Sequence, residues 1–130
     1  MPKSYLERIL RANVYDVARE TPLESMGLLS ERLGHNVLLK REDLQRSGSF
    51  KFRGAAHKLL ALAAAAGDGA PLPGLVTAST GNHARAVCAA LVATRVPVAA
   101  KPLIYVPTTV NRAKLARLEL FSDVVAVEQV

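Results

Sequence analysis

The sequence predicts an α/β fold built on a parallel sheet. Short apolar segments alternate with longer segments of helical composition, and this strand–helix order is typical of the α/β class. The apolar segments do not alternate with polar residues, which indicates strands buried on both faces by helices. Half of the 130 residues are hydrophobic but only 5% are aromatic. We therefore expect a modest core made of Ala, Val, Leu and Ile.

Two helices are predicted near the N-terminus from the spacing of their first residues. Ser4 and Glu7 have the spacing of a capping box, in which two side chains satisfy free amides at the start of a helix. The same spacing recurs at Thr21 and Glu24, and it predicts that a second helix begins there. Gly34 is expected to end this helix, because glycine readily adopts the left-handed conformation of a C-cap.

The remaining elements follow from apolar runs bounded by Gly and Pro. A connector at 67–74 contains two Pro and three Gly, and Pro107 stops an apolar run. Long segments rich in Ala and Leu predict helices, whereas short apolar runs predict strands. The predicted strands are 37–39, 75–78, 103–106 and 124–127, and the predicted helices are 52–66, 82–94 and 110–120.

Charge alone does not assign a partner. Seventeen Lys and Arg against eleven Asp and Glu give a net charge of +6, but the basic residues are scattered in runs no longer than two. A solvated basic surface is favoured over a nucleic-acid site, which would gather its cations on one face. Binding to nucleic acid or to an acidic protein is kept as a third hypothesis, and we expect neither nucleic acid nor membrane as a partner.

The chain is expected to be cytoplasmic. Its single cysteine, Cys88, lies in an apolar helical segment and is interpreted as a core residue and not as a nucleophile. Residues 1–11 are short and charged and do not resemble a signal peptide. No apolar run approaches the roughly 18 residues of a membrane span, and no Cys/His cluster suggests a metal site.

Two loops lie where an α/β sheet binds ligands, beyond the carboxyl ends of strands. In the loop from Ser79 to His83, free amides at a helix start, two hydroxyls and Gly81 could receive a carboxylate or phosphate. A polar helix cap without a ligand explains this spacing equally well. In the other loop Lys51 lies between Phe50 and Phe52, where partial desolvation could free a nucleophilic amine. Taken alone, an ordinary surface lysine is the favoured interpretation.

Together, the two loops resemble the paired signatures of the fold-type-II pyridoxal-phosphate (PLP) enzymes, and especially the threonine/serine dehydratases. The similarity covers most of residues 15–127. It implies a parallel three-layer αβα sheet of the tryptophan synthase β-like class, incomplete in this chain. The segments that carry the resemblance are 49–55 and 77–84, supported by 21–23, 29–34, 39–43, 105–107 and 114–115.

The resemblance implies a role for each site residue. Lys51 would hold PLP covalently and then remove the substrate's α-proton, Phe50 would pack against the cofactor ring, and Asn82 would bind its 3′ oxygen. The reaction would be the dehydration and deamination of L-threonine or L-serine to an oxo acid and ammonia. The residues expected around the substrate carboxylate are Ser79, Thr80, Asn82 and His83.

The resemblance also implies that the chain is only an N-terminal portion. Members of the family are longer, and their glycine-rich phosphate loop and the residue facing the pyridine nitrogen lie in a second half that has no match here. Residues 1–54 would begin the large PLP domain, and residues 55–130 would form part of a small α/β domain. We expect weak or no PLP binding by this chain alone, and a homo-oligomer in the full-length form. The alternative is a non-catalytic truncated chain or a half-domain that needs a complementary chain.

Overall fold

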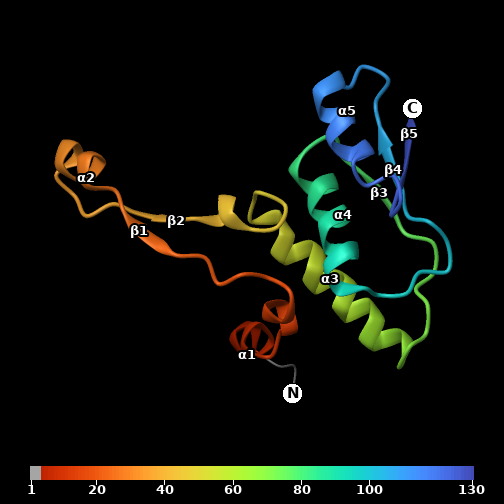
Figure 1. The fold of residues 1–130 in the computed structure, drawn as a ribbon. Helices are drawn as coiled ribbons and strands as arrows, with labels where there is room; N and C mark the ends of the chain where they lie inside the picture. Colours follow the sequence, from red (N-terminus) through yellow and green to blue (C-terminus); the bar gives the residue numbers. More distant parts are fainter. Residues whose placement is uncertain (1–3) are drawn as a thin grey trace.

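The computed structural model describes residues 4–130 and separates into two parts (Figure 1). Residues 22–41, here called the arm, project away from the rest of the molecule. Residues 51–129, here called the body, contain the long helices and the parallel sheet. The arm begins after α1 (Tyr5–Leu10) and the short 3-10 turn η1 (Asn13–Asp16), and a second turn, η2 (Glu42–Leu44), follows it.

Helix α1 starts as the sequence predicts. The Ser4 hydroxyl accepts a hydrogen bond from the amide of Glu7 at 3.2 Å, which satisfies one of the free donors of the first turn. The helix nevertheless buries none of its residues, and Tyr5, Leu6, Ile9 and Leu10 are all exposed. Capping therefore accounts for where α1 begins, whereas packing contributes little to it.

The arm consists of β1 (Leu23–Ser25), α2 (Gly27–Leu33) and β2 (Leu38–Lys40). The two strands pair antiparallel, with Leu23 opposite Lys40 and Ser25 opposite Leu38. The Ser30 hydroxyl accepts from the amide of Val37 at 2.9 Å, which ties α2 to the start of β2. None of the residues in these three elements is buried, so the arm has no core of its own.

The predicted start of the second helix is wrong. Residues 23–25 form a strand instead, because pairing with 38–40 satisfies their backbone groups, and α2 begins only at Gly27. The Thr21 hydroxyl does not cap a helix but donates to the carboxylate of Glu42. The predicted end is confirmed, since Gly34 caps α2 in the left-handed conformation at φ 65°.

The body carries the predicted α/β succession. Its strands form one parallel sheet in the order β3-β4-β5, with Val76 opposite Leu103 and Leu103 opposite Ala126. Most predicted bounds agree with the observed ones within two residues. The elements are α3 (Lys51–Ala66), β3 (Val76–Ala78), α4 (Asn82–Thr94), β4 (Leu103–Val106), α5 (Arg112–Glu119) and β5 (Ala126–Gln129).

The apolar runs predict that every strand is buried on both faces. None of the strands is buried completely. In β4, Ile104 and Val106 are buried while the residues between them are half-buried. In β3, Val76 is exposed. The predicted strand at 37–39 lies at Leu38–Lys40, pairs antiparallel and remains exposed. The difference arises because helices cover the sheet only in part, and the arm's strands have no covering layer at all.

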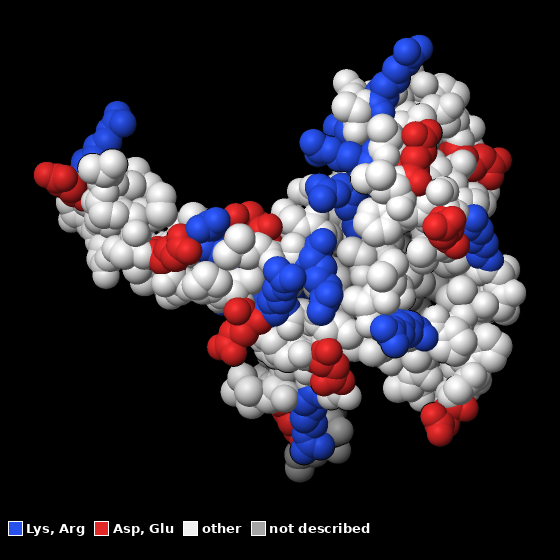
Figure 2. All heavy atoms as spheres, viewed as in Figure 1, with Lys and Arg blue, Asp and Glu red and all other residues white. Residues whose placement is uncertain are grey.

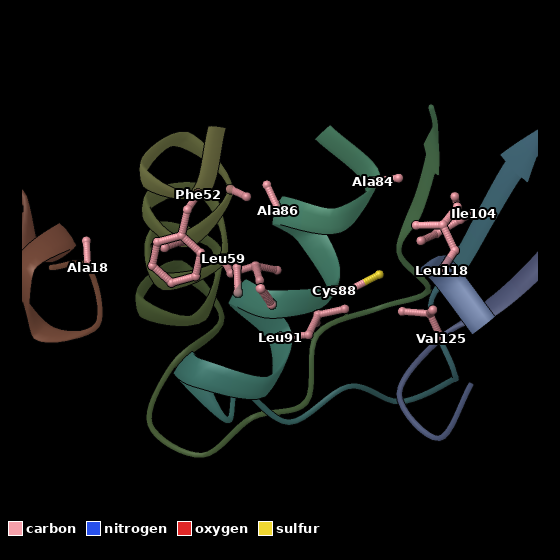
Figure 3. Packing of buried hydrophobic residues seen from close by; sticks show 14 of the residues in the cluster. Ala18, Phe52, Leu59, Ala84, Ala86, Cys88, Leu91, Ile104, Leu118 and Val125 are labelled. Carbon is pink, nitrogen blue, oxygen red and sulfur yellow. The ribbon is translucent and has the colours of Figure 1, made fainter. Parts of the chain in front are cut away.

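The core lies where α3, α4 and the sheet meet (Figure 3). Phe52 and Leu59 of α3 pack against α4, whose small buried residues allow the two helices to approach closely. On the other side of α4, Cys88 faces the region of Ile104. Burial raises the pKa of the Cys88 thiol to about 11 and keeps it protonated, which confirms its interpretation as a core residue.

Two further sequence-based expectations concern whole segments. Between residues 4 and 130, no helix has the length and apolar character needed to cross a membrane. Helix α3 runs unbroken through residue 54, the predicted boundary between two domains, and it buries Phe52 before that boundary and Leu59 after it. The division at 54/55 stays a prediction.

Candidate functional site

A cleft of about 520 Å³ lies between α3 and the strands β3 and β4, with part of α4 along its wall. Its volume falls within the range of small-molecule sites. The walls are mostly apolar, and no carboxylate side chain lines them. The polar groups that reach the cleft are Lys51, Lys58, Thr77 and His83.

Lys51 reaches this cleft because it is the first residue of α3. Successive residues of a helix point about 100° apart, so Lys51 lies beside the cleft while Phe52 is completely buried in the core. The Lys51 ammonium lies 5.2 Å from the centre of the Phe50 ring, at the distance of a cation–π contact. Phe50 also lines the cleft but is 61% exposed, so of the two neighbouring rings only Phe50 is beside the amine.

The predicted loop from residue 79 to residue 83 lies between β3 and α4. The Ser79 hydroxyl accepts from the amide of Gly81 at 3.2 Å, and Gly81 is the N-cap of α4 without any side chain capping that end. The first amides of α4 are therefore left free of side-chain partners and can attract an anion. His83, in the first turn of α4, lines the cleft.

The structure brings only part of the predicted site together. Lys51, Phe50 and His83 line the same cleft, whereas Ser79, Thr80 and Asn82 are not among its lining residues. The latter three remain next to it in the chain, in the turn that leads into α4.

Lys58 also lines the cleft, although it was not predicted as a site residue. It follows Lys51 by seven residues on α3, which is two helical turns, and the two lysines therefore lie on the same side of the helix. The seven-residue spacing of the two lysines in the sequence could have predicted that they face the same cleft. Together with His83, the two ammonium groups make the cleft favourable for an anionic ligand with an apolar body.

A second missed feature lies just behind the lysine. The Arg53 guanidinium donates two hydrogen bonds of 2.8 Å to the carboxylate of Glu42, in the fork-to-fork geometry of a strong ion pair. These bonds, together with the hydroxyl of Thr21, lower the pKa of Glu42 to about 2. Only tertiary folding brings these groups together, since no local pattern joins positions 21, 42 and 53.

On the face seen in Figure 2, acidic and basic side chains both occur on the arm and on the body. On the body, basic side chains gather from the region of the start of α3 up toward α5, although these residues are scattered in the sequence. Among the described residues, no group of three or more His, Cys, Asp and Glu side chains could hold a metal ion.

Comparison with known proteins identifies the family of the chain. A family model described as "Pyridoxal-phosphate dependent enzyme" matches residues 14–129. Threonine dehydratase 2 biosynthetic, chloroplastic, from Solanum lycopersicum is 47% identical over 111 residues, which is 85% of this chain and 17% of that protein. L-threonine dehydratase biosynthetic IlvA from Burkholderia multivorans is 48% identical over 111 residues, covering 85% of this chain and 20% of that protein.

The solved structures agree with the sequence comparison. The processed form of threonine deaminase isoform 2 from Solanum lycopersicum superposes with a TM-score of 0.77 at 39% identity. The match covers 97% of this chain and 32% of that one. A pyridoxal 5'-phosphate-dependent aspartate racemase gives a TM-score of 0.79 at 26% identity, over 99% of this chain and 39% of its own. The chain thus spans a third or less of the dehydratases and deaminase it matches.

Proposed function

The chain belongs to the family of pyridoxal-phosphate dependent enzymes, and on this premise we propose that it serves the β-elimination of water from L-threonine or L-serine. The products would be an oxo acid and ammonia. The observation that supports this most is that the Lys51 amine and His83 line one apolar cleft, within the segment that the family model matches.

The residues of the cleft fit PLP in two respects. Lys51 supplies a primary amine for the cofactor's aldehyde, and the apolar walls offer a dry surface for its ring. PLP, when bound, supplies an electron sink for the electron pair left at the substrate's Cα.

The protein's own contribution is to orient the substrate and to move a proton. Lys51 is proposed to accept the Cα proton, because its amine is the base that reaches the cleft from the start of α3. Phe50, beside this amine, is proposed to cover the ring of the cofactor. The apolar walls would keep water away from the reacting carbon.

The start of α4 is proposed to bind the substrate carboxylate. Its first amides lack side-chain caps, and the positive end of the helix dipole favours an anion there. Asn82 is further proposed to bind the 3′ oxygen of the cofactor. Seating the carboxylate on this turn would require the substrate to extend from the cleft toward the residues Ser79, Thr80, Asn82 and His83.

The finer assignments are proposals as well. Threonine and serine are both retained as proposed substrates, although the two relatives compared by sequence are named threonine dehydratases. A homo-oligomer in the full-length form and the absence of a nucleic-acid partner stay predictions. So does a cytoplasmic location, because one relative is designated chloroplastic.

One observation favours the alternative, a non-catalytic half that needs a complementary chain. The arm exposes Leu23, Leu28 and Leu33 by more than half of their surface, although no other part of the described chain covers them. Apolar side chains gathered on a segment without a core indicate a surface that another polypeptide covers.

Incubation with PLP, reduction with borohydride and peptide mapping test the proposal. Because only weak PLP binding is expected of this chain alone, PLP is supplied in large excess. Under these conditions we expect the cofactor to become fixed at Lys51 in the wild-type chain and to be lost from that peptide in Lys51→Ala, while Lys101→Ala serves as a control outside the cleft. Ammonia release from threonine and serine is measured in parallel. Fixation without turnover would favour the alternative. A Lys51 that stays unmodified in this excess, while other lysines of the chain react, would contradict the proposed function.

A further inference from the structure

Arg53 connects the helix that carries Lys51 to the segment before it. Among the described residues of α3, Arg53 is the only one whose side chain forms hydrogen bonds. Two of these bonds go to Glu42, and a third, of 3.1 Å, runs from Nη2 to the backbone carbonyl of Arg19. The guanidinium also lies 5.1 Å from the centre of the Tyr15 ring, so it is held on several sides.

The groups that receive Arg53 are themselves fixed. Glu42 accepts a further hydrogen bond from the hydroxyl of Thr21, which is only 4% exposed. The carbonyl of Arg19 also accepts from the Gln45 amide at 2.7 Å, and the amide of Arg19 donates to the other end of that side chain at 3.1 Å. Gln45 is equally buried. Arg53 is therefore bound to a network of satisfied polar groups that is part of the folded structure.

Apart from the buried ring of Phe52, the first turn of α3 has few contacts that define its orientation. Its N-cap, Phe50, provides no side-chain hydrogen bond, and the turn is closed only by backbone bonds from Phe52 to Ser49 and from Arg53 to Phe50. Lys51 belongs to this turn, and its side chain is long and exposed. Phe52 holds one side of this turn in the core, but a second anchor on the exposed side is needed to keep the turn from rotating or fraying and the Lys51 amine from sampling directions away from the cleft.

We propose that Arg53 and Glu42 are positioning residues that hold the first turn of α3 so that the Lys51 amine points into the cleft. The inference rests on the proposed role of Lys51 as the residue that receives the cofactor's aldehyde. Neither residue lines the cleft, so both act through the placement of the lysine. The planar fork of the arginine matters, because a lysine at position 53 cannot bind both carboxylate oxygens in this geometry.

Lys58 offers an internal reference for a test. It lies on the same helix and lines the same cleft, but it is two turns away from the Arg53 anchor. The wild-type chain, Glu42→Gln and Arg53→Lys are incubated with PLP, reduced with borohydride and digested. The ratio of modification at Lys51 to modification at Lys58 is then measured by mass spectrometry. The matched control is Glu24→Gln, which removes the same charge from an arginine pair within the arm.

We expect the wild-type ratio to favour Lys51 clearly and to fall about tenfold in Glu42→Gln and in Arg53→Lys, because a displaced amine loses most of its advantage of proximity. Glu24→Gln should retain the wild-type ratio. General loosening of the fold would alter both lysines together and would leave the ratio unchanged. Circular dichroism of each variant confirms folding, and the glutamine variant keeps the test valid if the lysine variant fails to fold.

The outcomes separate this inference from the function on which it rests. A wild-type ratio near one would overturn the proposed role of Lys51, and the positioning role with it. A high wild-type ratio that persists in both Glu42→Gln and Arg53→Lys would overturn the positioning role alone. An equal fall of the ratio in Glu24→Gln would also overturn the positioning role, since the loss of any arginine-paired carboxylate would then lower the ratio.

Discussion

The arm and the body are built from similar residue types but are stabilised in different ways. The body buries Phe52, Ile104 and Leu118 completely, and its helices and sheet share one core. The arm exposes its leucines, and its strands and helix contain no buried residue. Amphipathic composition therefore does not by itself create a core, because a core also requires a second layer to pack against.

The junction of the two parts is where the proposed chemistry lies. Lys51 is the first residue of the body, and the polar network of Glu42, Thr21 and Arg53 joins the base of the arm to the same helical turn. A change in the body core should therefore lower the stability of the whole fold. A change in the arm should affect only the stability of the arm. A change at the junction should alter the placement of the Lys51 side chain.

The largest effect is expected from Phe52→Ala. Phe52 is completely buried between α3 and the core, and removing a buried aromatic ring costs about 3–5 kcal/mol in unfolding free energy. Urea unfolding followed by circular dichroism measures this change. The contrasting variant is Leu28→Ala in the arm, where the side chain is 88% exposed and the expected change is within about 0.5 kcal/mol. Equal losses in the two variants would contradict the division into a packed body and an arm without a core.

Acid should weaken the junction by protonating Glu42. Arg53 holds the pKa of Glu42 at about 2, below its ordinary value of 4.5. A lowered carboxyl pKa means that the ion pair stabilises the fold fully above pH 4.5 and that this contribution is lost as the pH falls through about 2. Because the paired side chains keep 23% and 16% of their surface exposed, solvent screening limits the expected contribution to about 2 kcal/mol.

The difference between the wild-type chain and Glu42→Gln measures this contribution. Their unfolding free energies should differ at pH 6 and converge as the pH approaches 2, because the protonated glutamate then resembles the glutamine that replaces it. A difference that is independent of pH would show that the hydrogen-bond geometry, and not the charge of Glu42, stabilises the junction.

Local signals in the sequence predicted the body better than the arm. The helix at 82–94 and the strand at 103–106 were predicted with their observed bounds, because a polar turn, a proline and long apolar runs define them locally. The strand at 23–25 could not be predicted, since it exists only by pairing with residues 38–40. The capping-box spacing at Thr21 was therefore misleading, because that hydroxyl bonds to a group distant in sequence.

The candidate site shows the same limit. The motifs around Lys51 and His83 indicated the two residues that line the cleft together, because each lies at the start of a helix that the sequence defines. The Arg53–Glu42 pair was not predicted, because a side-chain pair between different elements depends on how those elements pack. Residues of a single local motif were thus easier to predict than a side-chain pair between segments distant in sequence.

A single kind of substitution, glycine to alanine, should have opposite effects in the two parts. Gly34 caps α2 at φ 65°, where an alanine is strained by about 1 kcal/mol. Gly54 lies within α3, and a Cβ atom built there meets nothing within 4 Å. Gly54→Ala should therefore stabilise the body by about 0.5–1 kcal/mol, since alanine is the better helix former.

Amide hydrogen exchange distinguishes the two effects. In Gly34→Ala we expect the amide of His35, which bonds to the carbonyl of Ser30 at the end of α2, to exchange about fivefold faster. The amides of α3 should keep their wild-type rates in that variant, because the arm shares no core with them. If exchange in α3 accelerated to the same extent, the arm and the body would unfold as one cooperative unit. The arm would then contribute to the stability of the body although its leucines are exposed.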